Sequence, residues 1–162
     1  MTSIESSAAA ERTGTDYQRT VLVKALPGAL FDALTTTAGL TAWWTQATGA
    51  GEAGGELKFF FEPPEPLVVN VDKATRPTSV QWTVKQCDFL SDWVGTRPSF
   101  TITAVGGGAA ELQFRHYGLT SELDCIQDCS RGWDHFLESL REYVEVGHGM
   151  PRGSDADKAR RL

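Results

Sequence analysis

The sequence has only three cysteines, Cys87, Cys125 and Cys129, among its 162 residues. An odd number of cysteines offers no disulfide framework, and a chain of this length buries enough surface to fold without crosslinks. We therefore expect three free thiols and a reducing, cytoplasmic location.

Long apolar runs and an excess of positive charge are also missing. The longest apolar runs, such as LVVNV at 67–71, are far shorter than the ~20 residues of a membrane-spanning helix. The first residues lack the basic start and apolar stretch of a signal peptide. Lys and Arg number 15 against 21 Asp and Glu, a net charge of −6. This balance argues against binding to nucleic acid or to an anionic membrane, because both depend on clustered positive charge.

The two ends of the chain lack apolar periodicity. Residues 1–16 are rich in Ser, Thr, Ala and Glu, and residues 148–162 combine Gly, Pro and alternating charge. Neither stretch has the apolar content that would offset the entropy of ordering it. We expect a disordered N-terminal tail over 1–16, one domain over 17–147, and a disordered C-terminal tail over 148–162.

Between the tails, alternating apolar residues predict strands bounded by turn signals such as PPEP at 63–66 and the glycines at 106–108. Short connections of this kind favour an antiparallel sheet. Two short helices over 28–35 and 38–44 and a flexible loop over 48–55 precede most of the strands. The predicted strands cover 17–26, 56–62, 67–74, 79–87, 99–105 and 109–118.

A long helix is predicted over residues 121–146. Ser121, with Asp124 three residues later, is a plausible start, and Gly147 is a plausible stop. A helix of this length covers a whole sheet, which gives an α+β architecture. Its apolar residues are spaced by three and four and form one stripe: Leu123, Ile126, Cys129, Trp133, Phe136, Leu137, Leu140 and Val144.

Five segments in the right order carry a resemblance to a known family. They are ALPGALFDALTTTAGLTAWW at 25–44, GGELKFFF at 54–61, RPTSVQWTV at 76–84, VGGGAAELQFRHYGL at 105–119 and GWDHFLESLREYVEVG at 132–147. Together they resemble the START and birch-pollen-allergen superfamily, in the branch similar to the C-terminal domain of the activator of the heat-shock-protein-90 ATPase. Two details depart from that pattern: Trp82 is slightly displaced, and Ala109-Ala110 stand where the family more often has a Thr.

The resemblance implies a helix-grip fold, in which a curved antiparallel sheet and two short helices wrap around one long C-terminal helix. It implies less about activity, because this fold hosts carriers, cyclases and chaperone regulators alike. A chaperone regulator would belong to the stress response.

Aromatic residues are the first candidates for a site. They could line a cavity between the sheet and the long helix, closed by the 48–55 loop and the 87–97 segment. Alternatively, the rings simply fill the core. The full aromatic set is Trp43, Trp44, Phe59, Phe61, Trp82, Trp93, Phe100, Phe114 and Trp133. The predicted ligand-binding residues are Trp44, Phe59, Phe61, Trp82, Phe100, Phe114, His116 and Trp133.

The polar candidates each have two interpretations. Strand parity turns His116 inward, where it could bind a ligand or act as an acid or base, or could form a structural hydrogen bond. Cys125 and Cys129 lie on one helical face and could begin a metal site, but further ligands at suitable spacing are missing. Core thiols are the alternative, so we expect no metal and no cofactor. The acidic face of the long helix is either solvated or a docking surface.

Three functions remain open at this stage. The leading hypothesis is a non-enzymatic module, monomeric or homodimeric, that holds a small apolar molecule in the cavity. The second is a module that docks on a chaperone or another protein. The third is a cyclase- or hydrolase-like enzyme on the same fold, although the sequence offers no set of nucleophile, base and orienting residue.

Overall fold

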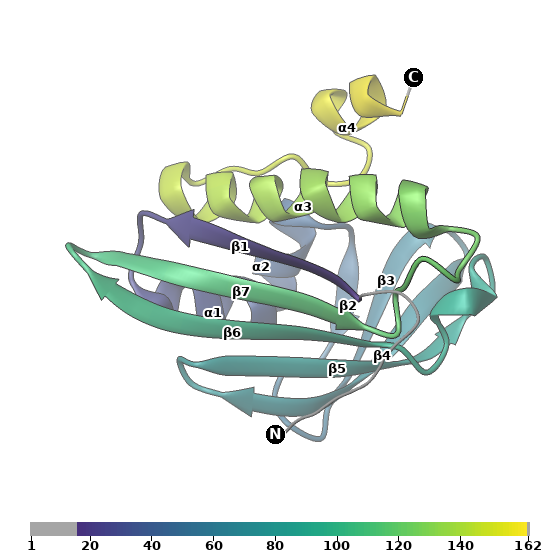
Figure 1. Cartoon of the computed structure of the whole chain (residues 1–162), viewed down its shortest axis with the longest axis horizontal. Coiled ribbons are helices and arrows are strands. Elements are labelled where there is room, and N and C mark those ends of the chain that lie inside the picture. The colour runs from purple at the N-terminus through teal and green to yellow at the C-terminus, as the bar shows by residue number, and fades with distance from the viewer. Residues whose placement is uncertain (1–15, 162) are drawn as a thin grey trace.

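The computed structural model describes residues 16–161. Its strands form one seven-stranded antiparallel sheet in the order β1-β7-β6-β5-β4-β3-β2 (Figure 1). The predicted antiparallel arrangement is confirmed. The strands are β1 (Tyr17–Val23), β2 (Ala47–Gly49), β3 (Glu56–Glu62), β4 (Glu65–Thr75), β5 (Ser79–Cys87), β6 (Arg97–Gly106) and β7 (Ala109–Tyr117).

The helices supply the second layer of the fold. The long helix α3 crosses the sheet, and α1 and α2 pack beside it against the same core (Figure 1). No helix in residues 16–161 has the length and apolar character needed to cross a membrane. The helices are α1 (Pro27–Thr35), α2 (Thr37–Trp43), the single 3-10 turn η1 (Ser91–Trp93), α3 (Ile126–Val146) and α4 (Asp155–Arg160).

The sheet curves because its ladder is interrupted at several points. The register shifts between Phe59 and Glu62 in the β3–β4 pair, and twice more in the β4–β5 pair. An extra residue on one strand bends that strand and increases its twist. Ladder pairing of β5 with β6 is confined to Ser79–Gln81. Further along, Val84 of β5 bonds to the residues just before β6: its amide donates to the carbonyl oxygen of Thr96 at 2.9 Å, and its carbonyl oxygen accepts from Gly95 at 2.8 Å. Space remains between the curved sheet, the segment that contains η1 and the first half of α3.

The predicted start of the long helix was wrong. The helix α3 begins at Ile126 rather than at Ser121, and no side chain caps its first turn. Residues 121–125 form turns instead. The predicted stop is confirmed: Gly147 is the C-cap and has a positive φ of 95°, a conformation that glycine adopts without strain.

The 48–55 loop is more ordered than its composition suggested. Its first residues form β2, which pairs with β3. Gly51 lies so close to the end of α1 that any Cβ would overlap the carbonyl oxygen of Thr35. The loop therefore packs on α1, and sequence periodicity missed this because the strand has only three residues.

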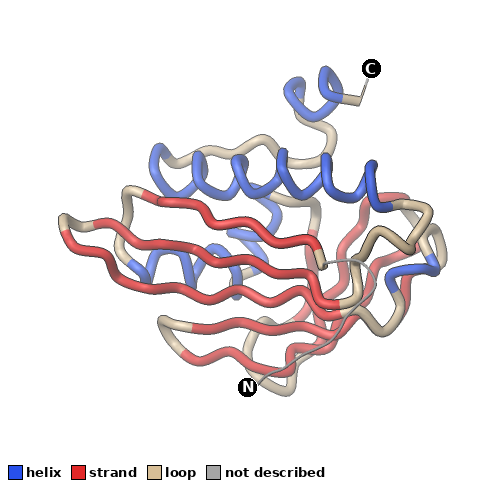
Figure 2. Tube along the Cα trace, in the orientation of Figure 1, coloured by secondary structure: helices blue, strands red, loops and turns tan. Residues whose placement is uncertain are grey.

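The C-terminal segment, residues 148–161, is the main correction to the expected domain limits. It is not a disordered tail: it returns along α3 and ends in α4 (Figure 2). The amide of Met150 donates to the hydroxyl of Ser139 at 2.6 Å, and the amide of Arg152 donates to the carbonyl oxygen of Trp44 at 2.8 Å. These contacts are polar, so apolar periodicity gave no sign of them. Of the N-terminal tail predicted over 1–16, only Asp16 is within the described residues, and it pairs with Arg115.

Ser139 is a testable attachment point for this segment. Its hydroxyl is fully buried, donates to the carbonyl oxygen of Trp43 at 2.7 Å and accepts from Met150. Ser139→Ala leaves both backbone groups without this partner, so we expect a loss of about 1–3 kcal/mol in the free energy of unfolding. The variant should also lose its C-terminal segment to trypsin faster than the wild type. Equal rates of cleavage would show that Ser139 does not hold the segment.

Candidate ligand-binding pocket

Aromatic side chains fill the middle of the space between the sheet and α3. Phe59, Trp82, Phe100 and Phe114 are each at most 1% exposed. Their rings contact one another in sequence: Phe59 lies 5.6 Å from Trp82, Trp82 5.1 Å from Phe100, and Phe100 4.9 Å from Phe114, between ring centroids. These four predicted binding residues pack the core and do not line the pocket described next.

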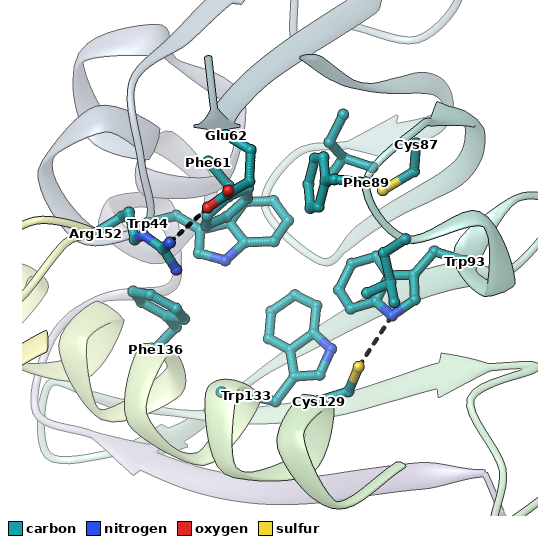
Figure 3. Close-up of a pocket in the computed structure, with 13 residues that line it drawn as sticks. Trp44, Phe61, Glu62, Cys87, Phe89, Trp93, Cys129, Trp133, Phe136 and Arg152 are labelled. Carbon is teal, nitrogen blue, oxygen red and sulfur yellow. Dashed lines mark hydrogen bonds and ion pairs between the residues drawn. The ribbon is translucent and has the colours of Figure 1, made fainter. Parts of the chain in front are cut away.

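A pocket of about 280 Å³ lies at the end of this space, below the first half of α3. One wall comes from η1 and the loop before it, which supply Trp93, Phe89 and Leu90, and the opposite wall includes Trp133 and Phe136 of α3 (Figure 3). Its walls are apolar except at one rim. The residues that line it are Trp44, Phe61, Glu62, Leu67, Cys87, Phe89, Leu90, Trp93, Cys129, Gly132, Trp133, Phe136 and Arg152.

A row of stacked indoles borders this pocket, and three of its members, Trp44, Trp93 and Trp133, line it. Trp43 stacks on Trp44 at 5.6 Å, Trp44 on Trp133 at 5.2 Å, and Trp133 on Trp93 at 6.1 Å between centroids. Trp82 stacks on Trp44 at 5.8 Å from the core side. Trp44 and Trp133 were predicted to bind ligand, and the structure brings them together with Phe61 at the pocket.

Other lining residues were missed, although some had a signal in the sequence. Phe89, Leu90 and Trp93 belong to the 87–97 segment that was predicted to close the cavity, and this segment does form one wall. Phe136 belongs to the predicted apolar stripe of α3. No sequence pattern indicated Arg152 as a lining residue, because it lies in the segment that was expected to be disordered. The 48–55 loop, also expected to close the cavity, does not line the pocket.

His116 lies behind the pocket rather than in it. It is fully buried, and both ring nitrogens have partners. Trp133 Nε1 donates to His116 Nδ1 at 3.0 Å, so the ring proton resides on Nε2, which lies 2.8 Å from Thr96 Oγ1. Thr96 in turn donates to the carbonyl oxygen of Trp93 at 2.6 Å. His116 therefore connects β7 to the indole of Trp133 and, through Thr96, to the backbone of Trp93.

Burial also sets the charge of this histidine. It lowers the pKa of His116 to about 3, and the negative charge of Asp16 opposes this only in part. The imidazole is neutral at physiological pH and holds the indole of Trp133 in place. Of the two interpretations of His116, the hydrogen bonds support the structural one.

The cysteines are all free thiols. Cys87 and Cys129 face the pocket, and Cys129 Sγ accepts from Trp93 Nε1 at 3.3 Å. Burial raises the pKa of Cys87 to about 11 and that of Cys129 to about 12. Both thiols are thus protonated at neutral pH and act as pocket walls. Within residues 16–161, no group of three or more His, Cys, Asp or Glu residues is arranged to hold a metal ion.

The charged rim of the pocket consists of Glu62, at the end of β3, and Arg152, from the C-terminal segment. Arg152 Nη2 donates to Glu62 Oε2 at 2.8 Å (Figure 3). The side chain of Arg152 is 26% exposed and that of Glu62 is 56% exposed. A less exposed cation and a more exposed anion thus border an otherwise apolar space.

Comparisons with known proteins place this geometry in a family. The Aha1 dimer from Colwellia psychrerythraea is similar, with 29% identity, a TM-score of 0.73, and coverage of 83% of this chain and 99% of that chain. Bacillus halodurans protein BH1534 shares the fold at 21% identity and a TM-score of 0.65, covering 81% of this chain and 97% of that one. CalU16 from Micromonospora echinospora also shares the fold, with 14% identity and a TM-score of 0.66, and the match covers 88% of this chain and 78% of that one. No curated protein matches the chain.

The family model described as "Activator of Hsp90 ATPase homolog 1-like protein" matches residues 24–145. This match covers the sheet from the end of β1 onward and nearly all of α3. It confirms the resemblance to the START and birch-pollen-allergen superfamily and the helix-grip fold. The chain belongs to the family of activator of Hsp90 ATPase homolog 1-like proteins.

Proposed function

We propose that the protein is a binding module that holds a small, largely apolar molecule in the pocket under α3. The observation that carries this proposal is that an apolar space of about 280 Å³ stays open beside an otherwise filled aromatic core. This volume is near the lower end of the range for ligand pockets, and the mixture of aromatic walls with a few polar groups is typical of them. The three free thiols support a reducing, cytoplasmic location.

The state of the reactive groups favours binding over catalysis. The thiols of Cys87 and Cys129 are protonated at neutral pH, and both ring nitrogens of His116 are engaged in hydrogen bonds. A nucleophile needs an adjacent base or a lowered pKa, and burial acts on these thiols in the opposite direction.

Gly132 offers a direct test of the pocket. It lines the pocket on α3 between Cys129 and Phe136, which also line it, and a Cβ added there meets no atom within 4 Å. Gly132→Leu should fill the pocket without straining the helix, and removing a mid-helix glycine adds up to about 1 kcal/mol of stability. We expect the variant to melt at or above the wild-type temperature and to lose ligand binding.

The neutral probe 1-octanol, titrated by calorimetry, measures that loss. Burial of its chain at about 0.8 kcal/mol per CH₂ corresponds to a dissociation constant of roughly 0.1 mM. Gly132→Ala, which adds one methyl group, is the matched control and should bind with intermediate affinity. Undiminished octanol binding to a folded Gly132→Leu variant would place the binding site elsewhere and remove the support for this proposal.

Docking on a chaperone or another protein is the second candidate, and a specific observation favours it. Leu22, Leu26 and Val146 are 58%, 66% and 61% exposed. They lie toward the end of the molecule where β1 and α3 finish, away from the pocket (Figure 1). A contiguous apolar patch on a surface marks a site of partner binding, and this alternative requires the three side chains to form one. In this alternative, Gly132→Leu leaves partner binding intact.

A further inference from the structure

The rim of the pocket contains an ion pair whose two members are held very differently. The backbone at Arg152 is anchored, because its amide donates to the carbonyl oxygen of Trp44, and within the same segment the amide of Gly153 donates to Asp157 Oδ2 at 2.9 Å. Glu62 is the last residue of β3, beyond a break in register, and is the more exposed partner. The backbone that carries the guanidinium is therefore anchored and the guanidinium is the less exposed partner, whereas the carboxylate of Glu62 can turn into solvent.

A second cation lies close to the same rim. The guanidinium carbon of Arg160 lies 5.0 Å from the ring centroid of Phe136, a pocket wall. Arg160 is held by Asp157, whose carboxylate is fully buried and also bonds to Arg161. The C-terminal segment thus brings two arginines toward the pocket, and the family model ends before it, at residue 145.

From this arrangement we infer that the pocket recognises a small apolar molecule that ends in a carboxylate. The apolar part occupies the space that Trp44, Trp93 and Trp133 line, and the carboxylate replaces that of Glu62 on Arg152. This inference rests on the proposed binding function and adds the chemical class of the ligand.

The exchange is favourable because the two carboxylates differ in their surroundings. An ion pair with a solvent-exposed partner contributes little to stability, so releasing Glu62 costs little. A ligand carboxylate arrives on an apolar body that shields the contact from water, where an arginine–carboxylate pair is stronger and can form two parallel hydrogen bonds. Arg152 then determines which head group is accepted.

Three probes with the same chain separate the possibilities: octanoate, 1-octanol and octylamine, titrated by calorimetry at neutral pH. The wild type should bind octanoate about tenfold more tightly than octanol, as a charge-assisted hydrogen bond predicts. Arg152→Gln should reduce this ratio to about one. Glu62→Gln should increase octanoate affinity, because the competing carboxylate is gone. Arg131→Gln removes an exposed arginine of α3 that does not line the pocket, and this matched control should keep the wild-type ratio.

The outcomes separate this inference from the proposed function. Tightest binding of octylamine would mean that Glu62 recognises the head group, and equal binding of all three probes would mean that the rim recognises none; either result overturns the inference and leaves the binding function intact. An octanoate preference that survives Arg152→Gln also overturns it. If no probe binds and Gly132→Leu changes nothing, both the inference and the proposed function fail.

Discussion

Replacement of Trp133 by alanine is expected to lower the free energy of unfolding by about 3–5 kcal/mol, the range for removing a large buried aromatic side chain. Trp133 is 2% exposed and packs 4.3 Å from Phe114 and 5.2 Å from Trp44 between ring centroids. Its indole N–H is also the donor to Nδ1 of His116, which would be left buried without that donor. Urea denaturation followed by circular dichroism measures the change.

Phe89→Ala is the matched control for this experiment. Phe89 lies at the same pocket but is 38% exposed, so its truncation should cost about 1 kcal/mol or less. Wild-type-like unfolding of Trp133→Ala would mean that α3 does not present this side chain to the core.

Acid should destabilise the protein through His116. In the folded chain its pKa is about 3, whereas an ordinary histidine has a value of 6.5. Below pH 6.5 the unfolded chain therefore binds a proton that the folded chain does not, so stability falls as the pH falls. The slope is about 1.4 kcal/mol per pH unit, or about 4 kcal/mol over the window from 6.5 to 3.

His116→Gln isolates this contribution from that of the carboxylates. A glutamine can accept from Trp133 with its oxygen and donate to Thr96 with its nitrogen, but it does not titrate. The difference in unfolding free energy between wild type and variant should therefore change steeply between pH 6.5 and 3 and be flat above it. Parallel curves for the two proteins would contradict a neutral, buried His116.

Sequence patterns predicted which face of the sheet each strand residue occupies. Phe59, Trp82, Phe114 and His116 were all expected to point inward, and all are buried. The alternation of side chains along a strand does not predict whether an inward-facing residue lines a cavity or packs against another side chain. That depends on how far along the strand the residue lies and on how its neighbours fill the space, which are properties of the assembled fold.

The charged rim of the pocket could not be predicted from the sequence. Glu62 and Arg152 are 90 residues apart in the chain, and no periodicity links them. The C-terminal segment that carries Arg152 is held by single polar contacts to Ser139 and Trp44 rather than by an apolar stripe. Contacts of this kind leave no repeating pattern, so composition alone suggested a tail.

The row of stacked indoles has a spectroscopic consequence. All five tryptophans of the chain belong to it, with neighbouring centroids 5.2–6.1 Å apart. At such separations excitation energy passes from ring to ring before it is emitted, and the coupled indole transitions give exciton bands in the circular dichroism spectrum. The intrinsic fluorescence is thus a single collective signal, which a molecule touching Trp93 alone would quench for the whole row.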